Sequence, residues 1–214
     1  MSIQEFNTLW LYRIVHIDNL AYLLKHGMYN KNHAQADANY ITIGDSILIQ
    51  QRSEYPVGIN PPNGLLGDYV PFYFGPLSPM LYNIATGYRA VTKRAQEDII
   101  YICCSVKSII DNCEQWCFTD GHAKNAITTF YNNLDLKHVD IQLTGQRYWN
   151  NTEDDFDRMR KKQAEFLVKS HVPPNCIKNI VVYNAKSEEK VNNLVKEFKG
   201  DINIHVNPNK RFYY

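Results

Sequence analysis

The 214-residue sequence lacks any apolar run of the roughly 18 residues that a membrane-spanning helix needs. Its first residues also lack a basic flank followed by an apolar run, so no secretion signal is predicted and we expect a cytoplasmic protein. Neither charge is in excess, because 23 Lys and Arg residues balance 22 Asp and Glu residues to a net +1. This balance excludes a protein that coats nucleic acid or membrane by bulk charge, and any polyanion must be bound by local patches.

The common signatures of phosphate, zinc and serine-nucleophile sites are also missing, since there is no G-x-G-x-x-G, Walker, H-E-x-x-H or G-x-S-x-G segment. Five cysteines are an odd number, which argues against a disulfide framework in a chain without a secretion signal. Cys113 and Cys117 have no second ligand pair at zinc spacing, and Cys103 and Cys104 lie in an apolar run. Core packing is therefore favoured over metal binding, and no metal site is predicted.

The apolar residues present are sufficient for one core. They make up 44% of the chain, and 214 residues fall within the usual size of one domain, so we predict a single domain over residues 1–214. The pattern of short strands with few β-α-β crossovers predicts an α+β fold. Tyrosine is unusually frequent, at 15 residues, and its flat ring with a polar tip suits a wide cleft that stacks other rings.

Local patterns predict the order of strands and helices. Strands are predicted over 10–16, 69–74, 98–106, 164–170, 179–184 and the start of 203–214, and helices over 17–27, 78–87, 121–133 and 187–199. Pro71 restricts the second strand to an edge or a bulge, whereas the apolar third strand is predicted to be central. Residues 28–67 are predicted to form a long loop with one helical turn near 45–51, and such long loops are usually functional.

The segment Gln163-Ala164-Glu165 is the first candidate site. In an extended chain, residues two apart point to the same side, so Gln163 and Glu165 are predicted to face one cleft. The basic run at 158–162 is expected to keep the carboxylate ionised. Such a carboxylate can orient a ribose hydroxyl, stabilise a developing glycosyl cation or accept a proton. Taken alone, the segment fits a solvated charged face better than a site.

Three further residues carry a functional and a structural interpretation. His16 follows a strand, where a lone histidine is more often part of the core. His122 falls in the first turn of the helix predicted over 121–133, where backbone N–H groups favour an anion, and the two interpretations are evenly balanced. Arg52 stands alone in a polar loop, where an exposed side chain is the default expectation.

Separated segments form a distinctive set when they are taken together. They are YRIVHIDNL at 12–20, Arg52 in its loop, GDYVPFYFGPLSPMLYNI at 67–84, CFTDGHA at 117–123, KKQAEFLV at 161–168 and the terminal FYY. Any one of them is weak, but their co-occurrence in this order is specific. In this set the chain resembles the DarT family, bacterial toxins that ADP-ribosylate single-stranded DNA using NAD, from residue 12 to residue 214.

The resemblance implies an ADP-ribosyltransferase fold with a split β-core, surrounding helices and NAD, as co-substrate, in a cleft between two small sheets. It implies that Glu165 and Arg52 are the catalytic residues. It further implies a set of cofactor-binding residues: Arg13, Ile14, Val15, His16, Asn19 and Gln163.

The resemblance also implies DNA-binding or site-lining roles for Tyr73, Met80 and His122. Arg94, in the basic stretch 89–94, is expected to contact DNA phosphates. An arginine that the family has just before the catalytic strand is replaced by Met159, and Arg158 or Arg160 is expected to substitute for it. Tyr69, Tyr73, Tyr148 or Trp149 is expected to stack bases.

The implied activity is transfer of ADP-ribose from NAD to a base in single-stranded DNA, with thymine the first candidate. The implied partner is an antitoxin with a macrodomain, similar to DarG, that removes the modification. Two alternatives remain open at this point. One is a transferase that acts on guanine, RNA or protein, and the other is a non-catalytic nucleic-acid-binding module, favoured if Gln163 and Glu165 face solvent.

Overall fold

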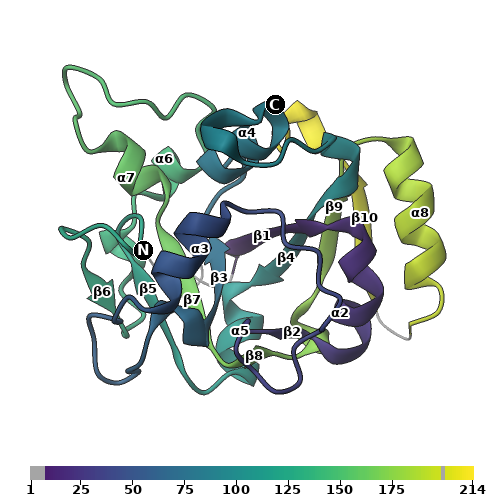
Figure 1. The fold of residues 1–214 in the computed structure, drawn as a ribbon, viewed down its shortest axis with the longest axis horizontal. Helices are drawn as coiled ribbons and strands as arrows, with labels where there is room; N and C mark the ends of the chain where they lie inside the picture. The colour runs from purple at the N-terminus through teal and green to yellow at the C-terminus, as the bar shows by residue number, and fades with distance from the viewer. Residues whose placement is uncertain (1–7, 199–200) are drawn as a thin grey trace.

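The computed structural model describes residues 8–198 and 201–214 of the chain (Figure 1). Its main sheet has eight strands in the order β10-β9-β4-β1-β3-β7-β5-β6. In chain order these strands are β1 (Trp10–His16), β3 (Tyr69–Tyr73), β4 (Ile99–Ser105), β5 (Trp116–Thr119), β6 (Phe130–Tyr131), β7 (Glu165–Lys169), β9 (Asn179–Val182) and β10 (Asn203–Val206). A separate antiparallel pair is formed by β2 (Met28–Tyr29) and β8 (His171–Val172).

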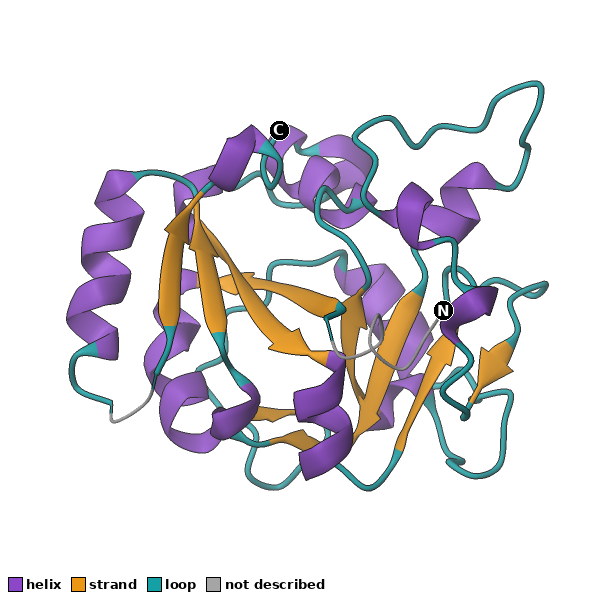
Figure 2. Cartoon of the chain, turned by 180° about the vertical axis from the view of Figure 1, so that it is seen from behind, coloured by secondary structure: helices purple, strands orange, loops and turns teal. Residues whose placement is uncertain are grey.

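The helices surround this sheet (Figure 2). They are α2 (Leu20–His26), α3 (Ser46–Ser53), α4 (Pro79–Thr86), α5 (Val106–Asn112), α6 (Ile141–Thr144), α7 (Arg158–Lys162) and α8 (Ala185–Val195). None of the helices within the described ranges has the length and apolar character that a bilayer crossing demands. The α+β fold class is confirmed.

The sheet is divided where β1 meets β3. These two strands share one residue pair, Tyr12 opposite Tyr73, whereas β1 pairs with β4 along its whole length and β3 pairs with β7 along its whole length. In Figure 1 the strands β9 and β10 lie on one side of the molecule and β5, β6 and β7 on the other. The sheet is therefore two four-stranded halves that diverge from a narrow junction, which is the predicted split β-core.

Pro71 does not place its strand at an edge, because β3 lies in the middle of the sheet order, between β1 and β7. Pro71 is opposite Leu167 of β7, and its carbonyl accepts a hydrogen bond of 2.9 Å from Arg13 Nη1 of β1. The N and O of one strand residue point to the same side, so the missing N–H of Pro71 faces the gap between the two halves. The proline is tolerated there because no ladder hydrogen bond is due at that position.

Several predicted elements are confirmed with their ends. The strand over 10–16 is β1, and α2 follows a short 3-10 turn and stops at Gly27, whose φ of 80° suits glycine. In α4 the Ser78 hydroxyl accepts the Leu81 N–H at 3.2 Å, and Gly87 closes the helix in the left-handed region. The segment 28–67 is mainly loop, with α3 capped by Asp45.

The helix predicted over 121–133 does not form, and turns lead instead to the short strand β6. Polar side chains in this segment bind backbone N–H groups that a helix would need. Asp120 Oδ1 accepts from the Thr129 N–H at 3.0 Å, and Asn125 Oδ1 accepts from the Ile127 N–H at 3.1 Å. Such local hydrogen bonds compete with the helical pattern, so His122 is not at a helix N-terminus.

Three smaller differences concern the segments around the sheet. The basic run at 158–162 is the short helix α7, and Gln163 is its C-cap rather than part of an extended strand. Ser105 ends β4 and caps α5, a helix that the sequence analysis did not predict. The end predicted for the last helix, at residue 199, lies outside the described residues, and α8 is assigned to Val195. All five cysteines are buried as free thiols in the core, as predicted.

Candidate active site

Glu165 is the first residue of β7 and lies opposite Tyr73 of β3, beside the junction of the two halves. Its backbone N–H donates to Thr119 Oγ1 of β5 at 3.0 Å, so the strand start is fixed to its neighbour. Glu165 is 3% exposed, yet its side chain lines a cavity of ≈ 790 Å³. Gln163 lines the same cavity, so the prediction that both residues face one cleft is confirmed, although only Glu165 is in a strand.

Arg52 reaches Glu165 from the last turn of α3, which lies in front of β3 and β7 in Figure 1. Its Nη1 donates to Oε1 at 2.9 Å and its Nη2 donates to Oε2 at 2.6 Å. This two-point geometry holds a carboxylate in one orientation. The side chains are 15% and 4% exposed, so the pair is largely shielded from solvent while it borders the cavity.

The charge state of Glu165 follows from its surroundings. Burial raises the pKa of Glu165. The charge and hydrogen bonds of Arg52, the nearby His122 and the Ala123 N–H at 3.0 Å lower it by a larger amount, so the net pKa lies below the ordinary value. The carboxylate is therefore ionised at neutral pH, as predicted, but the cation responsible is Arg52.

The basic run of α7 does not contact Glu165, contrary to the prediction. Arg160 pairs with Asp120 and Asp157, and Lys161 pairs with Asp155. Lys162 is buried and donates to the carbonyl oxygens of Pro76 and Thr144. The helical turn directs these side chains away from the start of β7.

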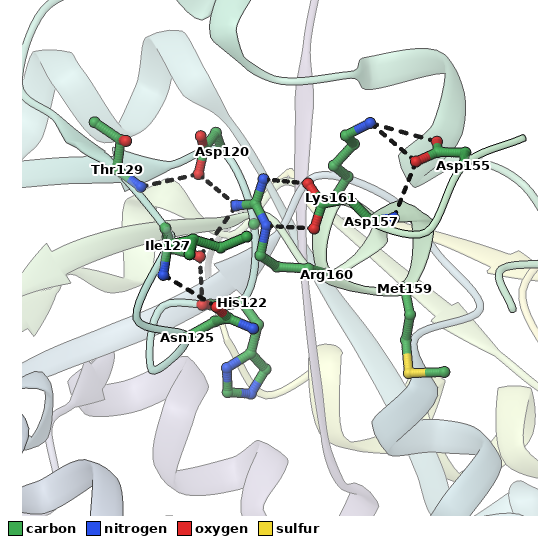
Figure 3. Close-up of polar contacts among 12 residues, drawn as sticks. Asp120, His122, Asn125, Ile127, Thr129, Asp155, Asp157, Met159, Arg160 and Lys161 are labelled. Atoms are coloured by element: carbon green, nitrogen blue, oxygen red, sulfur yellow. Dashed lines mark hydrogen bonds and ion pairs between the residues drawn. The ribbon is translucent and has the colours of Figure 1, made fainter. Parts of the chain in front are cut away.

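Two more titratable residues face Glu165 in the cavity. Burial, and then the charge of Glu165, raise the pKa of Tyr73, so its hydroxyl stays protonated. Burial lowers the pKa of His122, and its Nδ1 accepts the Lys124 N–H at 3.2 Å. The neutral ring therefore carries its proton on Nε2, and both the His122 ring and the Met159 side chain point away from the polar network in Figure 3, into the cavity that they line.

A second cavity of ≈ 320 Å³ adjoins the first. Its own wall includes Lys31 and Asp37 of the 28–67 loop and Tyr22 of α2. The residues common to both cavities are Arg13, Tyr40, Thr42, Ile49, Arg52 and Pro71. The two hollows are thus separated by the Arg13 and Arg52 side chains, and the long loop forms much of the boundary.

The residues predicted to bind NAD occupy different environments. Arg13 and Ile14 line the large cavity, whereas Val15 is fully buried in the core. His16 Nδ1 accepts the Asp18 N–H at 3.2 Å. Asn19 exchanges two hydrogen bonds of 2.9 Å with the backbone of Ile41, which fixes the long loop against the 3-10 turn that follows β1. Their roles toward NAD stay predictions.

The residues predicted to bind DNA also divide into two groups. Tyr73, Met80 and His122 line the large cavity. Arg94, Arg158 and Arg160 are not among the described residues of its wall, whereas Met159 is. The Arg158 guanidinium instead donates to the Tyr148 carbonyl at 2.8 Å. Contacts of any of these residues with DNA remain predictions.

The wall of the large cavity includes a group of aromatic residues, called here the aromatic rim, which the sequence analysis anticipated only in part. Besides Tyr148 and Trp149, the rim contains Tyr82, Tyr88 and Tyr214. The rings of Tyr82 and Trp149 meet edge to face at 6.1 Å. Arg89 and Arg147 lie on the same wall. The high tyrosine content was the available signal, but residues from 82 to 214 converge only in three dimensions.

No group of three or more His, Cys, Asp or Glu residues in the described chain is arranged to hold a metal ion. The arrangement instead joins a buried, ionised carboxylate to a cavity large enough for a nucleotide and to a neighbouring hollow with basic side chains. A fixed anion in this position stabilises positive charge that develops on a sugar ring.

Comparison with known proteins identifies relatives along nearly the whole chain. Residues 12–214 match the family model described as "ssDNA thymidine ADP-ribosyltransferase, DarT". The DNA ADP-ribosyl transferase of Thermus sp. (strain 2.9) is 34% identical over 205 residues, covering 95% of each chain. A fusion protein of Thermosipho africanus, described as a DNA ADP-ribosyl transferase joined to a DNA ADP-ribosyl glycohydrolase, is 29% identical over 95% of this chain and 49% of its own length.

Solved structures agree with this result. Thermus sp. 2.9 DarT in complex with ADP-ribosylated ssDNA superposes with a TM-score of 0.83 at 31% identity and covers 96% of both chains. The complex of Thermus sp. 2.9 DarT with NAD+ gives a TM-score of 0.80 at the same identity, over 96% of this chain and 98% of that one.

Proposed function

The chain belongs to the DarT family of ssDNA thymidine ADP-ribosyltransferases, and on this basis we propose that it transfers ADP-ribose from NAD to thymine in single-stranded DNA with Glu165 and Arg52 as its catalytic pair. The observation that carries the assignment of residues is the position of the Glu165 carboxylate. It is ionised, held by two bonds from Arg52 and open to the large cavity.

The reaction breaks the bond between nicotinamide and the C1′ atom of its ribose. Nicotinamide leaves as a neutral molecule with the bonding electrons, and positive charge develops on the ribose. The Glu165 carboxylate stabilises this charge in the transition state more than in the ground state. A ring nitrogen of the base then bonds to C1′ and loses its proton, which the ionised carboxylate of Glu165 can accept. The transfer is thus a glycosyl transfer.

We place NAD across the boundary between the two cavities. The small cavity offers Lys31, and Arg13 faces both hollows, so these two cations are available for the diphosphate while Arg52 stays paired with Glu165. The Asp37 carboxylate in the same hollow can accept a hydrogen bond from a ribose hydroxyl. This placement brings the nicotinamide end toward Glu165, which lines only the large cavity of the two.

The DNA strand occupies the large cavity in this proposal. A target base must leave any stack to reach Glu165, which favours single-stranded DNA. The aromatic rim offers surfaces for bases, each stacking contact contributing about 1–3 kcal/mol, and Arg89 and Arg147 can contact phosphates. Since the net charge of the chain is +1, binding depends on these local contacts.

We further propose that residues 1–214 form one ADP-ribosyltransferase domain and that the protein acts in the cytoplasm. The fusion of a related transferase to a DNA ADP-ribosyl glycohydrolase supports a partner of the opposite activity for this chain. Such a partner, an antitoxin with a macrodomain, would remove ADP-ribose from DNA and protect the cell.

Incubation with labelled NAD and oligonucleotides that contain one type of base tests the proposal. We expect label on single-stranded DNA with thymine, and loss of at least about 100-fold in rate for Glu165→Gln with retained DNA binding. If label appeared only on guanine, on RNA or on protein, that molecule and not thymine would be the acceptor. Full activity of Glu165→Gln would contradict the catalytic assignment.

A further inference from the structure

Arg160 is the centre of a polar network (Figure 3), and it is not among the described residues that line the large cavity. Its Nε and Nη2 donate to the two carboxylate oxygens of Asp157 at 2.7 and 2.6 Å. Its Nη1 donates to Asp120 Oδ1 at 2.7 Å and to Thr128 Oγ1 at 3.1 Å. The Arg160 side chain is 11% exposed. Its donors therefore face the protein on the side away from the cavity.

This network anchors the segment 120–129, which we call the 120–129 loop. The backbone carbonyl of Arg160 accepts the His122 N–H at 3.0 Å, and Thr128 Oγ1 donates to the His122 carbonyl at 2.9 Å. Gly121 packs directly under the guanidinium, because a Cβ atom there would lie 2.4 Å from Arg160 Nη1. Arg160 is thus hydrogen-bonded to three residues of the loop, Asp120, His122 and Thr128.

The 120–129 loop in turn holds the Glu165 side chain. The N–H of Ala123, a residue with no exposed surface, donates to Glu165 Oε1 at 3.0 Å. Thr119 Oγ1 donates to the Gly121 carbonyl at 2.7 Å and accepts the Glu165 N–H at 3.0 Å. The carboxylate is therefore oriented both by Arg52 from α3 and by the Ala123 N–H from the 120–129 loop.

We infer that Arg160 is a positioning residue for Glu165, acting through Asp120 and the 120–129 loop, and is not a DNA ligand. A contact between Arg160 and a phosphate would require its guanidinium to leave Asp120 and Asp157, whose side chains are 21% and 32% exposed and would lose their partner. This inference rests on the proposed role of Glu165. It corrects the expectation that Arg160 substitutes for the arginine replaced by Met159.

The decisive variant is Arg160→Gln. Its control is Lys161→Gln, which changes the next residue of the same helix and removes the ion pair between Lys161 and Asp155. We expect Arg160→Gln to lower kcat about 10- to 100-fold, with KM for NAD and Kd for the oligonucleotide changed less than about threefold. Lys161→Gln should leave all three values near those of the wild type. Thermal unfolding of each variant checks the fold.

The pH profile gives a readout that a general loss of stability does not produce. Weakening the Ala123 N–H contact raises the pKa of Glu165, so the acid limb of kcat should move to higher pH in Arg160→Gln. The other titratable or charged groups near Glu165, namely Arg52, Tyr73, Cys117 and His122, are unchanged in this variant. An acid limb that stays in place would overturn the inference.

Asp120→Asn provides a second test, and the only one needed if Arg160→Gln does not fold. Asp120→Asn should reproduce the loss of kcat and the shift of the acid limb to higher pH. Where both single variants fold, the double variant with Asp120→Asn and Arg160→Gln should have a kcat no lower than that of the slower single variant. A raised Kd for DNA, a salt slope reduced by about one and an unchanged kcat in Arg160→Gln would instead make Arg160 a phosphate contact. Wild type and Glu165→Gln, assayed alongside, report the proposed function separately.

Discussion

Arg52 and Glu165 are 113 residues apart in the chain and form a two-point ion pair at 2.9 and 2.6 Å. Arg52 comes from a helix in the long 28–67 loop, and Glu165 comes from a strand of the sheet half that contains β3. The proposed catalytic pair therefore depends on how the loop docks on the sheet. Asn19 contributes to this docking through its two bonds to Ile41.

The first prediction concerns acid stability. The pKa of Glu165 is lowered in the folded protein, so the unfolded chain binds more protons below about pH 4.3 and stability falls as the pH drops through that region. We expect Glu165→Gln to lower the free energy of unfolding by about 1–3 kcal/mol at pH 7. At pH 3 the difference in this free energy between wild type and variant should be smaller, because the wild type has lost the contribution of the ionised carboxylate. Urea denaturation at both pH values measures it, with exposed Glu189→Gln as control. A constant difference would contradict the prediction.

The second prediction concerns Lys162, whose pKa is lowered to about 7 by burial and by the nearby Arg158. Between pH 7 and about 10.4 the unfolded chain binds more protons than the folded protein, so the free energy of unfolding rises with pH. In Lys162→Met this rise should be smaller. Denaturation at pH 7 and pH 9 tests it, and equal slopes in both proteins would show that Lys162 stays charged in the fold.

A third prediction tests the aromatic rim. Tyr148 is 82% exposed and lines the cavity, so Tyr148→Ala should weaken single-stranded DNA binding by about 1–3 kcal/mol without affecting the fold. Hydrolysis of NAD without DNA should be unchanged. Phe156→Ala is the matched control, because Phe156 is 77% exposed on the same loop but is not among the residues of the cavity wall. Equal losses of affinity in the two variants would argue against a specific stacking surface.

The fourth prediction uses Met159, which lines the cavity and for which the resemblance implies that an arginine was replaced. Met159→Arg should add one phosphate contact, so the plot of log affinity against log salt concentration becomes steeper by about one. Affinity at low salt should rise, while Met159→Leu behaves like the wild type. Fluorescence anisotropy with a labelled thymine oligonucleotide measures both variants. An unchanged slope would show that a cation at this position does not reach the strand.

Motifs predicted the family and its activity correctly, and local rules predicted β1, α2 and α4 with their caps. Local rules failed where side chains compete with the backbone, as at Asp120 and Asn125, which bind N–H groups that a helix would have used. They also failed for Pro71. Its place in the middle of the sheet depends on the gap between β1 and β3, which is bridged by the hydrogen bond from the Arg13 side chain to the Pro71 carbonyl. A sequence pattern contains no record of such a gap.

The amino-acid order alone determined the kind of catalyst, because the short segments around residues 12–20, 67–84, 117–123 and 161–168 are specific as a set. Only the tertiary structure decided which charges meet. Arg160 and Lys161, close to Glu165 in the chain, turn to carboxylates of their own, while distant Arg52 becomes its partner. The physical reason is that a helical turn between neighbours points their side chains apart, whereas the docking of a long loop brings remote residues within hydrogen-bonding distance.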